Sequence, residues 1–242
     1  MGCEGNIARA LSVDPDGSVL GVDWSKIETV LLDMDGTLLD LRFDTEFWTR
    51  TLPAHYADEQ GISVADASAY LDPIHRREHG HLNWYCLDFW SETVGFDVAA
   101  LKREHRASIS WRPEAVNFLR RLQASHCRVV LVTNAHPETL AIKLEQLALA
   151  DWMDEIHSSH SFKAPKEYQA FWEGLQRVSP FDPQQTLFID DSESVLGSAA
   201  QYGISHLVTL RQPDSGQPPR TRTGYPAILH FSELFQGLPA DG

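Results

Sequence analysis

The sequence is poor in cysteine and has no long apolar run. Its 242 residues include three cysteines, Cys3, Cys86 and Cys127, an odd number without the spacing of a metal-binding motif. Reduced thiols are therefore expected, rather than a disulfide framework. No segment approaches the ~20 apolar residues that cross a bilayer, so no membrane partner is expected. The first residues also lack the basic and apolar regions of a secretory signal, and we expect a cytoplasmic location.

Positive charge is scarce as well. The chain has 20 Lys and Arg residues against 34 Asp and Glu, a formal net charge of −14, and no Lys/Arg cluster exceeds a pair. Such a surface repels a polyphosphate backbone, which argues against a nucleic-acid polymer as partner. The sequence contains neither G-x-x-x-x-G-K-[ST] nor G-x-G-x-x-G, so a nucleoside triphosphate or dinucleotide is not indicated. A small phosphate ester stays compatible with this charge if one lysine and a metal ion reverse the sign locally.

Apolar strand-like segments alternate with amphipathic helical segments along the chain. Its length and its 43% content of apolar residues suit one large α/β domain, or a core with a smaller insertion. The pattern predicts strands at 27–33, 128–133, 155–158, 186–191 and 205–209, and helices at 114–124, 137–149, after Pro165, and at 193–202 with Gly203 as the stop. Right-handed crossovers then predict a three-layer α/β/α Rossmann-like parallel sheet.

A long insertion separates the first two predicted strands. Between Asp35 and Arg128 lie about 93 positions, whereas a crossover between neighbouring parallel strands needs about 30 residues. Residues 41–111 are rich in helix formers and aromatics, and breakers at Pro53, Gly61, Pro73, Gly80 and Gly95 predict four or five short helices. We therefore predict a helical cap domain at 41–111, inserted into a core made of residues 1–40 and 112–242. Its position would hang it over the carboxyl edge of the sheet, where open α/β sheets bind ligands.

The remaining segments are irregular. Residues 1–26 are expected to be a loose lead-in with a turn at 14–17. Residues 213–224, rich in Pro, Gly and Ser, predict a mobile loop, and 227–235 a final segment that docks on the core.

Polar side chains gather at the ends of three predicted strands. They are Asp33 and Asp35 after the first strand, Thr133 and Asn134 after the second, and Asp190 and Asp191 after the fourth. Positions i and i+2 of a strand face the same side, and all parallel strands end at one edge of the sheet. Four carboxylates in one pocket repel each other, and a hard cation such as Mg²⁺ relieves that repulsion. We predict Mg²⁺ as the cofactor, with Asp33, Asp35, Asp190 and Asp191 as its ligands.

These motifs resemble those of the haloacid dehalogenase superfamily of aspartyl-nucleophile phosphotransferases. The resemblance implies that Asp33 is the nucleophile and that Asp35 is the general acid and base. It also implies that Thr133 and Asn134 bind the phosphoryl oxygens. Gly36 allows the chain to turn sharply behind the nucleophile, and its N–H is a further candidate to bind the anion.

The third motif of this superfamily is a lysine that neutralises phosphate and nucleophile. Two lysines compete for this role in Phe162-Lys163-Ala164-Pro165-Lys166. The usual order in the superfamily is Lys-Pro, whereas this chain reads Pro165-Lys166. Many catalytic lysines of the superfamily lie at the start of the following helix, which favours Lys166 over Lys163.

A closer resemblance, to the bacterial GMP/IMP nucleotidases of this superfamily, covers most of the chain. It is carried by the runs 31–41, 82–88, 133–137 and 164–167. In that group too the lysine follows the proline, which supports Lys166. The resemblance implies hydrolysis of a small phosphorylated substrate, a purine 5′-monophosphate.

The predicted cap concentrates donors and flat rings that suit a purine. Candidate substrate contacts are Arg76, His81, Asn83 and Tyr85. The competing interpretation is that Trp84, Leu87 and Trp90, which recur at helical spacing, form the cap's own apolar core. We favour the core role for Trp90.

Two other functions stay open on the sequence alone. One is a sugar-phosphate phosphatase or a phosphomutase similar to β-phosphoglucomutase. The other is a catalytically inactive binding module, which the intact set of motifs disfavours. The chain is expected to be a monomer or a homodimer.

Overall fold

The computed structural model describes residues 22–240. Most of the predicted lead-in, with its turn at 14–17, and Cys3 lie outside the described residues. The part of the lead-in that is described is not loose. Trp24–Lys26 form a short 3₁₀ helix, Trp24 is buried, and its indole Nε1 donates a hydrogen bond to Leu234 O at 3.0 Å.

Six parallel strands form the sheet, in the order β3-β2-β1-β4-β5-β6. The strands are β1 (Thr29–Leu32), β2 (Arg128–Thr133), β3 (Glu155–Ser158), β4 (Thr186–Ile189), β5 (His206–Leu210) and β6 (Ala227–Ile228). The first five confirm the predicted strands within a few residues. The sixth lies in the predicted docking segment and was missed, since its two residues give too short a pattern to recognise.

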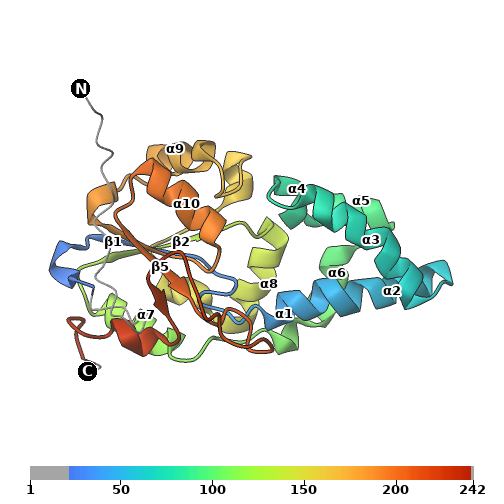
Figure 1. Cartoon of the computed structure of the whole chain (residues 1–242), viewed down its shortest axis with the longest axis horizontal. Helices are drawn as coiled ribbons and strands as arrows, with labels where there is room; N and C mark the ends of the chain where they lie inside the picture. Colours follow the sequence, from blue (N-terminus) through green and yellow to red (C-terminus); the bar gives the residue numbers. More distant parts are fainter. Residues whose placement is uncertain (1–21, 241–242) are drawn as a thin grey trace.

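Helices cover both faces of the sheet, which confirms the predicted α/β/α layers (Figure 1). The helices α7 (Ala115–Gln123) and α8 (Pro137–Leu147) lie on one face, and α9 (Gln169–Val178) and α10 (Glu193–Tyr202) on the other. Gly203 ends α10 at φ 110° as predicted, in the left-handed conformation that glycine adopts without strain. Strand β1 is buried along its whole length because side chains pack against it from both layers.

The register of the central strands brings their ends together. Leu32, the last residue of β1, pairs with Leu131 in β2 and with Ile189 in β4. The residues that follow these strands therefore emerge at one edge of the sheet, where Asp33, Asp190 and Asp191 come together.

Residues 41–111, called the cap below, are mainly helical. They contain α1 (Arg42–Glu46), a π-helical stretch (Phe47–Thr51), α2 (Leu52–Gln60), α3 (Val64–Glu78), α4 (Leu82–Tyr85), α5 (Leu87–Val94), α6 (Val98–Glu104) and a 3₁₀ turn (Arg106–Ser108). Two predicted breaks are wrong. Pro53 lies in the first turn of α2, directly continuous with the π-helical stretch, and Pro73 lies inside α3.

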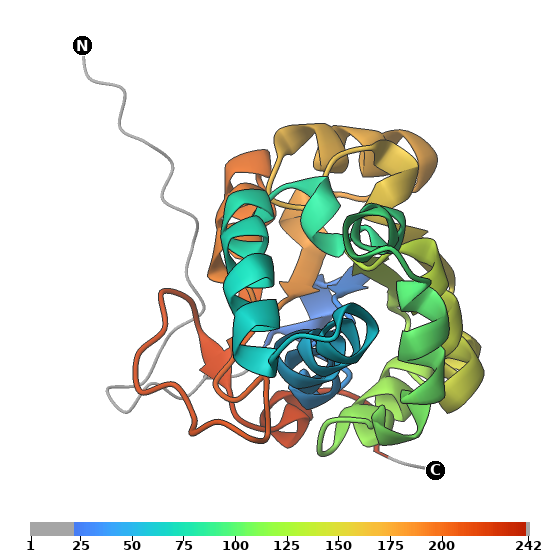
Figure 2. The same cartoon turned by 90° about the vertical axis from the view of Figure 1, so that its right-hand side faces the viewer.

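Two adjacent backbone segments, residues 38–40 and 110–112, form the neck that joins the cap to the core. Asp40 N donates to Ser110 O at 3.0 Å and Arg112 N donates to Leu38 O at 2.9 Å. Beyond this neck the cap has its own apolar cluster, centred on Phe47, Leu71 and the fully buried Trp90. Figure 2 looks from the cap towards the carboxyl ends of the strands, which lie behind the cap helices. The treatment of 41–111 as a separate domain stays a prediction that this arrangement supports.

The segment 213–224 has no regular secondary structure and forms hydrogen bonds with both the cap and the core. Leu41 N donates to Pro213 O at 3.0 Å, and Arg220 Nη1 donates to Asp191 O at 2.7 Å. Its mobility stays a prediction. Within residues 22–240, no helix is long and apolar enough to cross a membrane.

Candidate active site

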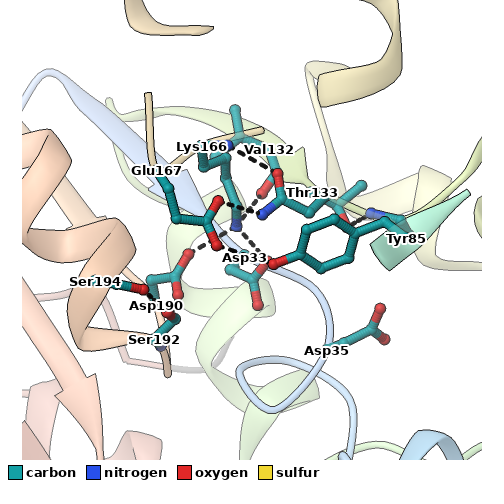
Figure 3. Close-up of polar contacts among 12 residues, drawn as sticks. Asp33, Asp35, Tyr85, Val132, Thr133, Lys166, Glu167, Asp190, Ser192 and Ser194 are labelled. Atoms are coloured by element: carbon teal, nitrogen blue, oxygen red, sulfur yellow. Dashed lines mark hydrogen bonds and ion pairs between the residues drawn. The ribbon is translucent and has the colours of Figure 1, made fainter. Parts of the chain in front are cut away.

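Lys166 forms the centre of the charged group at the edge of the sheet. Its ammonium Nζ lies 2.5 Å from Asp33 Oδ1 and 2.7 Å from Asp190 Oδ2, and it donates to Val132 O at 3.1 Å (Figure 3). All three charged side chains are buried, so these contacts are shielded from water. The structure thus brings Lys166, and not Lys163, to the predicted nucleophile.

The positions of the two lysines follow from the backbone between them. Lys163 ends a 3₁₀ turn (Ser159–Phe162) in the left-handed conformation, at φ 55°. Lys166 lies in the turn before α9, three residues earlier than the helix start we expected for it. Its backbone N–H donates to Asn134 Oδ1 at 2.9 Å, which anchors the turn beside the end of β2.

Three carboxylates form a compact group suited to a metal ion. One ligand oxygen from each of Asp33, Asp190 and Asp191 lies within 4.8 Å of the others. Asp190 is further fixed because Ser192 N donates to its Oδ1 at 2.8 Å. An all-oxygen set of this kind fits a hard cation such as Mg²⁺.

The electrostatics of this group also favour a cation. Burial raises the pKa of Asp33 to about 6, with Lys166 opposing the shift and Asp190 adding to it. Burial, and then the charges of Asp190 and Asp33, raise the pKa of Asp191 well above its usual value. A bound cation would stabilise the ionised forms of these carboxylates.

Asp35 lies apart from this group. Its carboxylate forms an ion pair with Lys143 of α8, and Figure 3 shows it turned away from Lys166. The predicted ligation of the metal by the Asp35 side chain is therefore not seen in this arrangement. Burial, opposed by Lys143, raises the pKa of Asp35 to about 6, which suits a group that exchanges a proton near neutral pH.

A chain of buried charges extends from Asp35 into the cap. Lys143 Nζ also lies 2.5 Å from Asp44 Oδ2, and Asp44 Oδ1 lies 2.7 Å from Lys102 Nζ. Lys143 and Lys102 are almost completely buried. Despite burial, the two lysines hold the pKa of Asp44 down at about 2. This network joins α8 of the core to α1 and α6 of the cap.

A second polar network joins the end of β2 to the cap. Thr133 Oγ1 accepts a hydrogen bond from Ala135 N at 3.0 Å. Asn134 Nδ2 donates to Glu167 Oε2 at 3.0 Å, and Tyr85 OH donates to Glu167 Oε1 at 2.9 Å. Asn134 therefore holds Lys166 and Glu167 in place, besides lining the cavity as expected for a phosphate-binding residue.

Gly36 has a steric role in this structure. Its backbone has φ +81°, and a Cβ added there would lie 2.7 Å from Asp191 Cγ. Its N–H donates to Leu39 O at 2.8 Å, so the predicted contact between this N–H and an anion is not available in this arrangement. Only glycine combines this conformation with the close approach of Asp191.

A cavity of about 730 Å³ lies between these residues and the cap. Of the four predicted cap contacts, only Tyr85 lines it. Arg76 and His81 are exposed, and Asn83 is exposed and donates to Glu78 Oε2 at 3.1 Å. The pattern of donors predicted the segment of the cap that borders the cavity. It did not predict which side chains face the cavity, because the packing of α3 and α4 leaves Arg76, His81 and Asn83 exposed.

Aromatic rings form the cap wall of the cavity instead. They belong to Trp48, His75, His79 and Trp84. His75 stacks on the buried Trp90 with ring centroids 4.1 Å apart. Its Nε2 is buried without a hydrogen-bond partner in the described part of the chain, and burial lowers its pKa. The wall thus offers flat surfaces and one free polar atom.

Several residues of the site were missed by the sequence analysis. They are Asp44, Lys102, Lys143, Glu167 and Arg220. Glu167 directly follows the motif lysine, and that position is a signal that could have found it. The two buried lysines gave none, because a lysine on a helix is ordinarily solvated.

The parallel sheet, the inserted cap, and an aspartate at the end of β1 beside a buried lysine together define a class of α/β hydrolases. A family model described as haloacid dehalogenase-like hydrolase matches residues 27–203, and the chain belongs to this family. Its GMP/IMP nucleotidase relatives place it among the phosphatases of the family. The chain is 38% identical over 219 residues to GMP/IMP nucleotidase YrfG of Escherichia coli, covering 90% of this chain and 99% of that protein. The identity and coverage are the same for GMP/IMP nucleotidase YrfG of Shigella flexneri.

Solved structures agree on the fold. A HAD phosphatase from Thermococcus onnurineus superimposes with a TM-score of 0.70 at 21% identity, over 87% of this chain and 97% of that one. A putative β-phosphoglucomutase from Thermotoga maritima gives a TM-score of 0.61 at 18% identity, over 87% of this chain and 97% of that one.

Proposed function

We propose that the protein is a Mg²⁺-dependent phosphomonoester hydrolase that converts purine 5′-monophosphates, GMP or IMP, to nucleoside and phosphate through an aspartyl phosphate. The observation that carries the proposal is the placement of Asp33 between Lys166 and the carboxylates Asp190 and Asp191, at the floor of the cavity. An isolated buried carboxylate would be protonated and a poor nucleophile, whereas a neighbouring ammonium favours its ionised form.

The proposed reaction has two steps. Asp33 Oδ attacks phosphorus, the bond from phosphorus to the 5′-oxygen breaks, and Asp35 gives its proton to the leaving oxygen. Asp35 then takes a proton from water, which attacks the phosphorus of the aspartyl phosphate and releases Asp33. Lys166 and Thr133 would stabilise the negative charge on the phosphoryl oxygens.

Asp33, Asp190 and Asp191 would hold the metal ion. Mg²⁺ at these oxygens would neutralise part of the negative charge that the substrate phosphate meets. Burial and the repulsion among these carboxylates raise the pKa values of Asp33 and Asp191, and a cation at their oxygens would favour the ionised forms.

The cap wall supports a purine nucleoside as the leaving group. The cavity is large enough for a nucleoside monophosphate, since ligand cavities of about 300–1,000 Å³ are usual for small molecules. The rings of Trp48, Trp84 and His79 offer stacking surfaces, and His75 also lines the cavity, with a buried Nε2 that lacks a partner among the described residues. The nucleotidase activity named for the two bacterial relatives is the second support.

A substrate panel at saturating Mg²⁺ tests the proposal. We expect phosphate release from GMP and IMP with a higher kcat/KM than from hexose phosphates. Asp33→Asn should abolish turnover, and wild type quenched in acid should carry phosphate on Asp33. Fastest release from a hexose phosphate, with none from GMP or IMP, would favour the sugar-phosphate phosphatase or the β-phosphoglucomutase-like alternative. Turnover retained by Asp33→Asn would refute the mechanism.

The role of the base pocket is tested separately. In His75→Leu, which removes the polar atom but keeps an apolar side chain, KM for GMP should rise while turnover of a small aryl phosphate stays close to wild type. The loss of one hydrogen bond predicts about a 2–10-fold effect. An equal change for both substrates would mean that His75 supports the cap only. The cytoplasmic location and the choice between monomer and homodimer remain predictions.

A further inference from the structure

A second group of metal-ligand side chains lies outside the proposed catalytic site. Ligand atoms of Cys86, His136 and His160 all lie within 4.8 Å of one another. Cys86 lies between α4 and α5 of the cap, His136 is the N-cap of α8, and His160 lies in the 3₁₀ turn that precedes Lys163. None of the three lines the cavity that contains Asp33.

The ligand atoms of this second group differ in chemical type from those of the catalytic carboxylates. One thiolate and two imidazoles are borderline-soft ligands, typical of zinc sites, whereas the catalytic carboxylates offer only oxygen. Asp88 Oδ2 lies 3.6 Å from His136 Nε2, and its side chain is mostly exposed and free to turn. It is therefore available as a fourth ligand.

His160 shows the clearest sign of a missing partner. Its Nε2 is buried and has no hydrogen-bond partner among the described residues. An imidazole nitrogen is a common metal ligand, and a buried polar atom without a partner is otherwise costly.

We propose that Cys86, His136 and His160, with Asp88, form a site for a borderline-soft divalent cation such as Zn²⁺. Binding through His136 Nε2 requires the proton at Nδ1. The contact from Glu138 N to His136 Nδ1, already long at 3.4 Å, would be lost on binding. Cys86 is a free cysteine at intermediate exposure, so the cation can reach its thiol.

The site would join the cap to the core. Cys86 and Asp88 belong to the cap, while His136 and His160 belong to the core, and Figure 1 shows α4 beside the core segment that precedes α9. A cation held by both parts stabilises the arrangement in which they are close together. A cation that holds the cap against the core would oppose opening of the cavity between them, and we expect an occupied site to slow turnover.

Cobalt spectroscopy tests the site without reference to activity. The double variant Cys3→Ser/Cys127→Ser keeps Cys86 as its only cysteine. One equivalent of Co²⁺ should give this variant a thiolate-to-cobalt charge-transfer band, which the all-oxygen catalytic site cannot produce. Adding Cys86→Ser should abolish the band, and His160→Gln should weaken Co²⁺ binding by at least about 10-fold, since even outer partners of metal ligands are worth 10–100-fold. Circular dichroism of each variant confirms folding. A double variant without the band would overturn the proposal.

Inhibition by zinc tests whether a cation bound between the cap and the core slows turnover. Micromolar Zn²⁺ at saturating Mg²⁺ should inhibit the wild type, and Cys86→Ser should be at least about 10-fold less sensitive. Equal inhibition of both proteins would place the inhibitory zinc at the catalytic carboxylates and overturn the proposed coupling to the cap. Both experiments can fail while GMP turnover is normal, so they are independent of the proposed function.

Discussion

The hydroxyl of Tyr85 donates a hydrogen bond to Glu167 Oε1 at 2.9 Å, which joins α4 of the cap to the residue after the active-site lysine. Burial raises the pKa of Tyr85 well above its usual value, so the hydroxyl keeps its proton and acts as a donor. Glu167 in turn accepts from Asn134, whose Oδ1 accepts from Lys166 N. The position of the cap is thereby coupled to the turn that carries Lys166.

Removing this contact should impair catalysis modestly. For Tyr85→Phe we expect kcat/KM for GMP to fall by about 2–10-fold, because one hydrogen bond contributes about 0.5–1.5 kcal/mol. Steady-state kinetics measure this, with Tyr70→Phe as the control, since Tyr70 is an exposed tyrosine of α3. The same loss in both variants would contradict a specific role of Tyr85.

The two lysines around Pro165 make a matched pair. Lys166→Met removes the cation between Asp33 and Asp190, and we expect kcat to fall by about 10²–10³-fold or more, as when a donor to developing charge is removed. Lys163→Met should stay within about twofold, as for most substitutions at the surface. A larger loss in Lys163→Met than in Lys166→Met would show that the wrong lysine has been assigned.

Alanine variants of Gly36 and Gly61 distinguish the effect of backbone strain from that of a steric clash. Both have positive φ, but a Cβ at Gly36 would lie 2.7 Å from Asp191 Cγ, whereas nothing lies within 4 Å at Gly61. Each alanine variant should lose about 1–2 kcal/mol of unfolding free energy to strain. Only Gly36→Ala should also need a higher Mg²⁺ concentration for half-maximal activity, because it displaces Asp191. Unchanged Mg²⁺ dependence in Gly36→Ala would disprove this role of the glycine.

Asp44 should stabilise the fold in a pH-dependent manner. Asp44→Asn leaves Lys102 and Lys143 buried beside a neutral group, and breaking such a buried pair costs about 3–5 kcal/mol near neutral pH. The pKa of Asp44 is about 2 in the folded protein against 3.8 ordinarily, so its contribution is complete above pH 3.8 and is lost as pH falls through 2.

Denaturant unfolding at several pH values measures this contribution. The difference in unfolding free energy between wild type and Asp44→Asn should narrow as pH decreases from about 4 to about 2. Asp58→Asn, at an exposed position of α2, is the control and should differ little from wild type at any pH. A difference that stays constant with pH would mean that the charge of Asp44 does not contribute.

Much of the core could be predicted because its signals are local. The apolar run before Asp33 and the two carboxylates that follow it are readable within ten residues, and so is the run before Asp190. Once parallel strands are inferred, their common edge brings these groups together without further information. The position of the cap followed from a length argument that is equally simple.

The faces of the cap helices could not be predicted in the same way. Arg76, His81 and Asn83 were chosen for their chemistry, but α3 and α4 direct them away from the cavity. The rings that line it, among them Trp48 and Trp84, were indistinguishable in sequence from rings of an apolar core. A helix has two possible faces, and only its packing against neighbours decides which one meets the cavity.

The sequence by itself determined that a strand and a turn place two carboxylates at the end of β1, since these features depend only on residues close together in the chain. Tertiary structure alone decided the partners of those aspartates. Lys166 reaches Asp33 from 133 positions away, and Lys143 reaches Asp35 from 108 positions away. Whether a lysine is solvated or buried against a carboxylate depends on how separate helices pack, and this packing determines the charge state of the site.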